Sequence, residues 1–176
     1  TGDFGDEVKN DLLNIANSLG AKGRVVEQKE PLGTAGGLKP HKEKFKDPFF
    51  VTNCDIIIDS DYSDIYNFHK STKNDLTLVA STKDFEIPYG ICELDKKGQL
   101  SDINEKPKQN FLANTGLYIL NPDVLDLIPE DKFFHMTELI KNANKKKMKI
   151  GVYPIEDSKW LDIGQWSEYR KSLKFD

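Results

Sequence analysis

The sequence predicts an α/β protein in which a mixed β-sheet is layered with helices. Short hydrophobic runs typical of strands alternate along the chain with segments whose apolar residues recur at helical spacing. A Lys-Lys-Gly turn at residues 96–98 separates two of these runs and indicates an antiparallel hairpin. With 176 residues, 38% of them hydrophobic, the chain is long enough for one domain with a sizeable core.

The individual elements follow from local patterns. The expected strands cover residues 24–26, 49–53, 76–80, 90–94, 100–103, 116–120 and 150–153. The expected helices cover 6–18, a segment that follows the capping residues 61–64, then 122–129, 136–143 and 163–173. Ligands of such sheets bind beside the carboxyl ends of the strands. Polar residues that follow strands are therefore the first candidates for a functional site.

Charge and composition exclude several classes of function. The formal net charge is −4, so the chain lacks the long-range attraction that drives non-specific nucleic-acid binding. No apolar run approaches the roughly 20 residues that span a bilayer. Cys54 and Cys92 are far apart in the sequence and fit a reducing cytoplasm. We expect a cytoplasmic protein with no nucleic-acid and no membrane partner, and the sequence leaves open whether it forms a homo-oligomer.

A glycine-rich loop at residues 30–38 is the first candidate for ligand binding. Its three glycines, at positions 33, 36 and 37, let a backbone turn sharply and approach a flat or anionic ligand, and Thr34 adds a hydroxyl. An ordinary turn that needs positive φ angles explains the glycines equally well. The spacing differs from a dinucleotide fingerprint.

Two aspartates are candidates for binding a metal ion. Asp55 follows the hydrophobic strand at 49–53, and its carboxylate suits a hard divalent cation such as Mg²⁺. Asp162 precedes the last expected helix, where it is either that helix's N-cap or a second carboxylate for the same metal. Asp59 and Asp61 resemble the acidic signature of glycosyltransferases, but their place before a helix favours capping.

The remaining polar candidates are weaker when taken singly. Glu105 and Lys106 can grip a sugar hydroxyl and a phosphate, or form a solvent-facing ion pair, and Pro107 holds Lys106 out of a helix. The three histidines, His41, His69 and His135, share no metal-ligand spacing, so we interpret them as surface or partly packed residues.

Taken together and in order, six short motifs carry a resemblance that none carries alone. They are Glu-Pro-Leu-Gly-Thr-Ala-Gly at 30–36, Asn-Cys-Asp at 53–55, Tyr-Gly at 89–90, Glu-Lys-Pro at 105–107, Asn-Thr-Gly-Leu-Tyr at 114–118 and Trp-Leu-Asp-Ile-Gly at 160–164. The series resembles the sugar-phosphate nucleotidyltransferase family over nearly the whole chain, and looks most like its mannose-1-phosphate guanylyltransferase branch.

The resemblance implies a fold and a set of roles. The fold is a Rossmann-like mixed sheet layered with helices, and residues 1–176 are expected to form a single nucleotidyltransferase domain. The implied roles are nucleotide binding by Glu30, Gly33 and Thr34; Mg²⁺ binding by Asp55 and Asp162; sugar-phosphate binding by Gly90, Glu105, Lys106 and Asn114; and catalysis by Asp55, Asp162 and Lys106.

The sequence also departs from the family pattern. Cys54 stands where the family usually has glycine, and His135 stands where an acidic residue is more usual. The family's opening strand and its Gly-x-Gly-x-Arg phosphate loop are missing from the sequence. We therefore expect an N-terminally truncated chain, the C-terminal portion of the family's catalytic domain, and the missing loop puts the activity of this piece alone in question.

The implied reaction is transfer of a nucleoside monophosphate from a nucleoside triphosphate, with GTP favoured, to a sugar 1-phosphate. Its products are a nucleoside diphosphate sugar and pyrophosphate, and the displacement is in line and Mg²⁺-dependent. Two alternatives stay open at this point. One is a metal-dependent GT-A-like glycosyltransferase that uses Asp59 and Asp61, and the other is a non-catalytic sugar-nucleotide-binding module.

Overall fold

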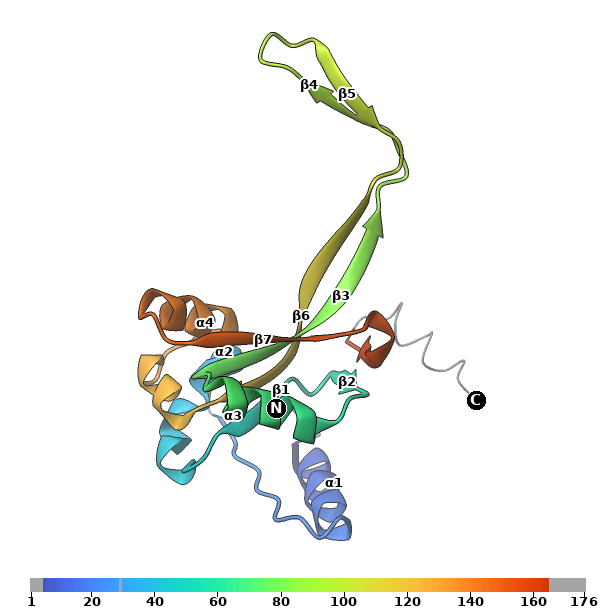
Figure 1. The fold of residues 1–176 in the computed structure, drawn as a ribbon. Helices are drawn as coiled ribbons and strands as arrows, with labels where there is room; N and C mark the ends of the chain where they lie inside the picture. Colours follow the sequence, from blue (N-terminus) through green and yellow to red (C-terminus); the bar gives the residue numbers. More distant parts are fainter. Residues whose placement is uncertain (1–4, 29, 165–176) are drawn as a thin grey trace. The chain divides into compact units, whose positions relative to one another are not determined.

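The computed structural model of the protein describes residues 5–28 and 30–164 (Figure 1). It forms two compact units, Thr1–Leu32 and Gly33–Asp176. The first contains helix α1 (Gly5–Ser18), which confirms the helix expected at 6–18 and is followed by Gly20 at φ +68°. The strand expected at 24–26 is wrong, because these residues have no ladder partner in the described part of the chain.

The second unit is built on a four-stranded mixed sheet, which confirms the predicted α/β class. The strand order is β1 (Phe49–Thr52), β6 (Lys108–Leu120), β3 (Leu76–Glu86) and β7 (Ile150–Ile155). β6 pairs antiparallel with both of its neighbours, whereas β3 and β7 run parallel. The parallel pair requires a long crossover, and the chain between β3 and β7 supplies it.

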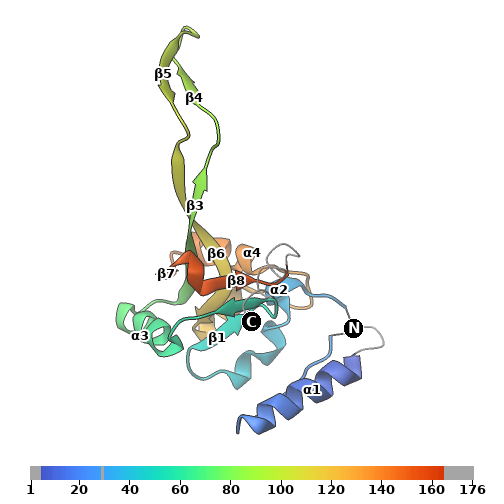
Figure 2. The same cartoon turned by 90° about the vertical axis from the view of Figure 1, so that its right-hand side faces the viewer.

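Helices and short helical turns lie on both faces of this sheet (Figures 1 and 2). The α-helices are α2 (Gly33–Gly36), α3 (Tyr62–Thr72) and α4 (Met136–Lys145). The 3₁₀ segments are η1 (Lys39–Lys44), η2 (Pro122–Leu127) and η3 (Asp157–Lys159). Side chains of β6 alternate between the layers: Tyr118 and Leu120 pack with α4 and η2, while Leu117 and Ile119 pack towards α3.

The interpretation of His69 as a surface or partly packed residue is wrong, because this side chain of α3 is 1% exposed. Its Nδ1 lies 2.8 Å from the Thr77 hydroxyl, and its Nε2 lies 3.1 Å from Asn121 Oδ1. The Asn74 side chain also donates to the Thr77 hydroxyl, at 3.0 Å. Both ring nitrogens of His69 thus have a hydrogen-bond partner, so this histidine serves packing.

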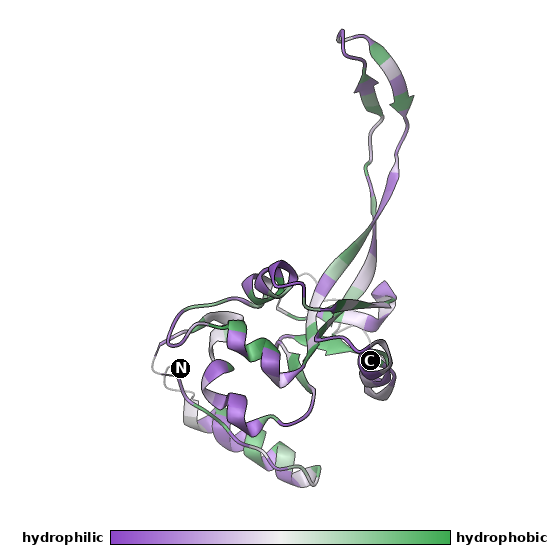
Figure 3. Ribbon diagram, turned by 60° about the vertical axis from the view of Figure 1, so that its left-hand side comes forward, coloured by the Kyte–Doolittle hydropathy of each residue, from purple (hydrophilic) through white to green (hydrophobic). Residues whose placement is uncertain are grey.

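A long arm projects from the sheet (Figures 1 and 2). β3 and β6 continue as a hairpin beyond the core, which makes both strands much longer than the predicted 76–80 and 116–120. The tip is a separate two-stranded sheet of β4 (Ile91–Leu94) and β5 (Leu100–Asn104), which confirms the expected hairpin. Hydrophobic residues recur along the arm (Figure 3), and most of its large apolar side chains are 38–73% exposed.

A third, two-stranded sheet pairs β2 (Ile56–Ile58) with β8 (Trp160–Asp162) in antiparallel register. The sequence patterns predicted neither strand, because each is only three residues long. The helix expected at 163–173 falls almost entirely outside the described residues, which end at Gly164.

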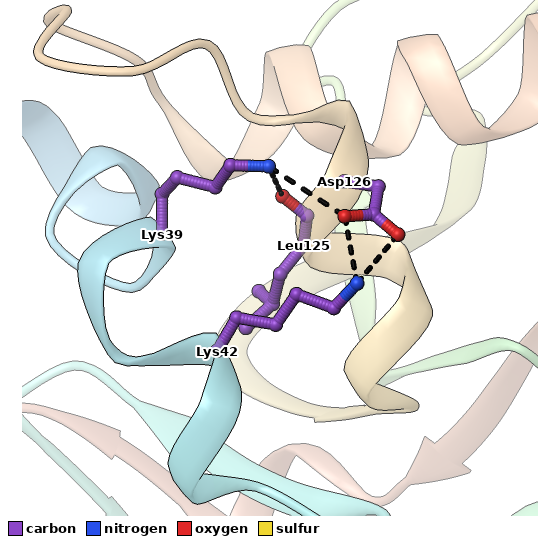
Figure 4. Close-up of polar contacts among 4 residues, drawn as sticks. All are labelled: Lys39, Lys42, Leu125 and Asp126. Carbon is purple, nitrogen blue, oxygen red and sulfur yellow. Dashed lines mark hydrogen bonds and ion pairs between the residues drawn. The ribbon is translucent and has the colours of Figure 1, made fainter.

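Two lysines tie η1 to η2 (Figure 4). Lys42 Nζ lies 2.7 Å from both carboxylate oxygens of Asp126, and Lys39 Nζ donates to the Leu125 carbonyl at 3.2 Å. The Lys42 hydrogen bond lowers the pKa of Asp126, and the same bond raises the pKa of Lys42.

None of the helices in the described part of the chain combines the length and apolar character that crossing a membrane requires.

Candidate functional site

A cavity of about 350 Å³ lies in the second unit, where several elements end. It is bordered by the chain after β1, the glycine-rich turn α2, the start of α4, strand β8 and an irregular stretch of β6. The lining residues are Thr34, Asn53, Asp55, Ile56, Asn114, Thr115, Gly116, Tyr118, His135, Met136, Thr137, Trp160 and Asp162. The cavity therefore collects residues from four of the six motifs that carried the resemblance.

Asp55 and Asp162 lie side by side in the cavity wall because two short strands pair there. Ile56 of β2 stands opposite Asp162 of β8, and the Ile163 N–H donates to the Asp55 carbonyl oxygen at 2.9 Å. A Cβ placed on Gly164 would lie 2.7 Å from Asp55 Oδ2 and 3.2 Å from Asp162 Oδ1. The two carboxylates, which are more than a hundred positions apart in the sequence, thus converge on one point.

The donor set of the cavity suits a hard divalent cation. Its two converging carboxylates supply oxygen ligands. No group of three or more His, Cys, Asp or Glu residues in the described ranges could hold a metal by itself. Mg²⁺ is usually held by one or two carboxylates, with water and substrate phosphates as its other ligands, so two carboxylates fit it.

The glycine-rich turn is anchored to the start of α4. Gly33 has φ +72°, and a Cβ on it would lie 2.7 Å from the Phe134 carbonyl oxygen, which explains the requirement for glycine. That oxygen accepts from the N–H groups of Ala35 and Gly36 at 3.0 and 3.1 Å. Gly33 therefore packs against protein backbone and does not line the cavity.

Thr34 does line the cavity, and its hydroxyl has a defined direction. Thr34 Oγ1 accepts from the Met136 N–H at 2.9 Å, so its proton remains for donation to a ligand. Glu30, the third residue of the predicted nucleotide site, belongs to the separate unit Thr1–Leu32.

A bulge in β6 forms another wall of the cavity. Three residues of β6, from Thr115 to Leu117, stand opposite the single residue Val79 of β3. The Thr115 hydroxyl donates to the Val79 carbonyl at 2.9 Å and accepts from the Leu117 N–H at 3.3 Å. Gly116 takes φ +91° within the bulge, and the Asn53 side chain packs against it. Bulges redirect side chains in this way beside functional sites.

The bulge brings Asn114 and Tyr118 together at the cavity. Asn114 Nδ2 donates to the Tyr118 hydroxyl oxygen at 2.6 Å, and Asn114 Oδ1 accepts from the Gly116 N–H at 3.3 Å. Burial raises the pKa of the Tyr118 hydroxyl, and the hydrogen bond from Asn114 partly offsets that rise in pKa. The hydroxyl is therefore neutral at neutral pH.

Comparison with known proteins assigns the chain to a family. A family model described as Nucleotidyl transferase matches residues 5–176. The chain belongs to the nucleotidyl transferase family. The resemblance found in the six sequence motifs is thereby confirmed.

Several curated relatives of this chain are named for one reaction. Probable mannose-1-phosphate guanylyltransferase 2 of Oryza sativa subsp. japonica is 32% identical over 173 residues, covering 94% of this chain and 47% of that protein. Mannose-1-phosphate guanyltransferase 2 of Candida glabrata is 37% identical over 149 residues, covering 80% of this chain and 40% of that protein. The chain spans about half the length of the curated relatives it matches.

Solved structures agree with the fold. HddC from Yersinia pseudotuberculosis has a TM-score of 0.69 and 26% sequence identity, and the match covers 98% of this chain and 75% of that one. A putative glucose-1-phosphate thymidylyltransferase from Bacillus anthracis has a TM-score of 0.66 and 20% identity, with 98% of this chain and 72% of that one covered.

The structure does not bring all of the predicted site residues to one place. Gly90, Glu105 and Lys106 lie on the arm, where β3 and β6 pass into the tip, and none of them lines the cavity. They are neighbours of one another: a Cβ on Gly90 would lie 2.8 Å from Glu105 Oε2, and the Lys106 N–H donates to the Tyr89 carbonyl at 3.3 Å. Asn114 alone of the predicted sugar-phosphate residues reaches the cavity.

Sequence reasoning missed several cavity residues. His135 is exposed, which agrees with its interpretation as a surface or partly packed residue, but it also lines the cavity, where its ring contacts Phe133. Tyr118 sat in a recognised motif, but only its hydrogen bond to Asn114 shows that it belongs to the site. Asp61 caps α3 by accepting from the Ser63 N–H at 2.7 Å, as expected, and neither it nor Asp59 lines the cavity.

Proposed function

We propose that this protein transfers a nucleoside monophosphate from a nucleoside triphosphate, with GTP favoured, to a sugar 1-phosphate. The observation that carries the proposal is the convergence of Asp55 and Asp162 on one point of a cavity that Thr34 and Asn114 also line. The preference for GTP rests on the relatives, which are named as mannose-1-phosphate guanylyltransferases. We assign this function to residues 1–176 as one domain, since the family model spans both compact units.

The reaction is a direct displacement. A phosphate oxygen of the sugar 1-phosphate attacks the α-phosphorus of the triphosphate, and the bond from that phosphorus to the pyrophosphate oxygen breaks on the opposite side. The attacking oxygen is already ionised, so no general base is required. Holding both substrates in line supplies on the order of 7 kcal/mol of the lowering of the barrier.

Different residues of the cavity bind the metal ion, the nucleotide and the sugar. Asp55 and Asp162 would hold Mg²⁺, which supplies charge neutralisation and a template for the phosphates when bound. The Thr34 hydroxyl donates to the nucleotide, and Asn114 binds the sugar. For Gly90, Glu105 and Lys106 to contact the same sugar phosphate, the arm must bend towards the cavity at the break between its two ladders.

The two cysteines indicate the cellular compartment in which the reaction takes place. Cys54 and Cys92 are both free and exposed, as is usual in the reducing cytoplasm. We therefore place the reaction there, with nucleoside triphosphate and sugar 1-phosphate as the partners.

The test is pyrophosphate release by the natural full-length chain, measured with a panel of triphosphates and sugar 1-phosphates. We expect release only when both substrates and Mg²⁺ are present, and fastest release with GTP. Asp162→Asn should slow release by about 100-fold, the size of losing one preorganised electrostatic group, while sugar phosphate still binds.

Asp59→Asn is the matched control, because Asp59 is an exposed carboxylate outside the cavity. Near-normal release by Asp162→Asn would remove this residue from the mechanism. Consumption of a sugar nucleotide without pyrophosphate release, abolished by Asp59→Asn, would instead identify a glycosyltransferase.

A further inference from the structure

The side chain of Tyr118 occupies an unusual place for a phenol. It is 4% exposed and packs among the apolar residues of the α4 side of the sheet, yet it also lines the cavity. A phenylalanine would fill nearly the same volume without bringing a polar atom into the core. The hydroxyl therefore calls for an explanation other than packing.

The Gly116 N–H sets the orientation of the neighbouring Asn114 amide, and the Tyr118 hydroxyl holds the other end of that amide in place. The Gly116 N–H is a donor, so the atom that faces it must be the amide oxygen of Asn114. The amide nitrogen then faces the Tyr118 oxygen, which accepts from it at 2.6 Å. Rotating the amide by half a turn would set two N–H donors against each other. The two contacts together thus permit a single orientation.

Fixing the amide defines what it can recognise. One N–H of Asn114 is used by Tyr118, and one lone pair of its oxygen is used by Gly116. One N–H and one lone pair remain, and neither has a partner among the described residues. A group that both accepts and donates a hydrogen bond matches this pair, and a sugar hydroxyl is such a group.

We propose that Tyr118 is a positioning residue that holds the Asn114 amide in the orientation that binds a hydroxyl of the sugar substrate. The proposal rests on the proposed function, because that function supplies the sugar. Tyr118 acts through Asn114 and not by contacting the substrate. A Phe at 118 would leave the amide held only by the Gly116 N–H at 3.3 Å, so its nitrogen end would swing and present the donor correctly for only part of the time.

The first test needs no ligand. Nuclear magnetic resonance of the ¹⁵N-labelled chain would identify the side-chain amide signals of Asn114 as the pair lost in Asn114→Ala. We expect Tyr118→Phe to shift these signals and to speed their exchange with water at least several-fold. Tyr153→Phe is the matched control, since this tyrosine lies in the packing layer on the other face of the sheet.

The second test measures binding of mannose 1-phosphate by calorimetry in a double-mutant cycle. Tyr118→Phe should weaken binding by about fivefold to tenfold, the worth of one hydrogen bond. In the Asn114→Ala background the same substitution should change binding less than twofold, because the residue through which Tyr118 acts is gone. Melting temperatures of both variants monitor folding.

The outcomes separate the inference from the proposed function. Unchanged Asn114 signals in Tyr118→Phe, or an equal loss of binding in both backgrounds, would overturn the positioning role; the latter would show direct contact with the ligand. Absence of mannose 1-phosphate binding by the unaltered chain would count against the proposed function, and the amide signals would still decide whether Tyr118 orients Asn114.

Discussion

At the scale of single residues, Gly164 has the clearest influence on the two cavity carboxylates. Its φ lies outside the left-handed region, so the backbone itself would tolerate a side chain. The space is what excludes one, because Asp55 Oδ2 and Asp162 Oδ1 both lie within 3.2 Å of the position that a Cβ would take. The glycine therefore keeps open the point at which the carboxylates meet.

Gly164→Ala should consequently affect metal binding more than stability. The added methyl group would push the flexible Asp55 carboxylate aside, which costs the fold little, but would spoil the geometry of the pair. We expect Mn²⁺, used as a spectroscopic substitute for Mg²⁺, to bind about tenfold more weakly, as when a supporting group of a metal site is lost. Electron paramagnetic resonance titration measures the affinity, and an unchanged affinity would contradict the assignment.

Residues of the site differ in how far the sequence could predict them. Asp55 and Asp162 were placed together through the resemblance, and antiparallel pairing of β2 and β8 brings them together in the structure. The role of Tyr118 was not predictable, because it depends on a hydrogen bond created by the bulge. A tyrosine in a hydrophobic strand has the same pattern whether or not its hydroxyl serves a site.

At the scale of elements, polar contacts tie the short helical segments η1 and η2 together. The link between η1 and η2 is formed by Lys42 and Asp126 on the surface. Because the pKa of Asp126 is lowered in the folded state, its contribution to stability is present above its ordinary pKa of 3.8 and is lost as the pH falls below it.

Asp126→Asn should therefore lower the melting temperature by about 1–3 °C at pH 7, in keeping with an exposed ion pair. The difference from the unaltered chain should shrink at pH 3, below the ordinary pKa of 3.8, and should vanish once the pH has fallen through the lowered pKa of the folded state. Thermal unfolding followed by circular dichroism at the two pH values gives the comparison. Asp123→Asn in the same segment is the control, and a difference that persists at acid pH would refute the linkage.

Elements with a strong internal pattern were predicted well, whereas those that depend on a distant partner were not. Helix α3 has its capping residue at Asp61 and a clear apolar face, and it forms where expected. Residues 24–26 have strand-forming side chains but no ladder partner in the described part of the chain. The three-residue strands β2 and β8 form only because the fold brings them together, so neither has a readable signal of its own.

At the scale of the second unit, the core and the arm are stabilised separately. Both clusters of buried side chains lie around the four-stranded sheet, and neither includes a residue of β4 or β5. An isolated two-stranded hairpin is marginally stable in water, so the tip contributes little to the stability of the sheet.

Replacing residues 91–104 by a short glycine-containing turn should therefore leave the core folded. We expect the melting temperature to change by less than about 4 °C, which corresponds to roughly 1 kcal/mol for a chain of this size. Calorimetry measures the transition, and the near-ultraviolet circular dichroism of the core aromatics serves as the control for native packing. A fall of more than about 10 °C would show that the tip supports the core.

The mixed sheet was predictable from the alternation of strands and helices, but the length of β3 and β6 was not. Their outer halves are exposed and mixed in polarity, so no pattern of alternating burial marks them in the sequence. Gly90, Glu105 and Lys106 lie on this exposed arm and do not line the cavity, although the resemblance implied that they bind the same substrates as the cavity residues.

The bulge at Thr115–Leu117 affects how ligand recognition in such a protein can evolve. The pairing on either side of it is regular, with Tyr118 opposite Leu78 and Asn114 opposite Ala80. Removing two residues between these pairs would restore an uninterrupted ladder and spare the sheet, while dismantling the wall that presents Asn114. A small deletion or insertion at this one place can thus erase or redraw ligand recognition on an intact scaffold.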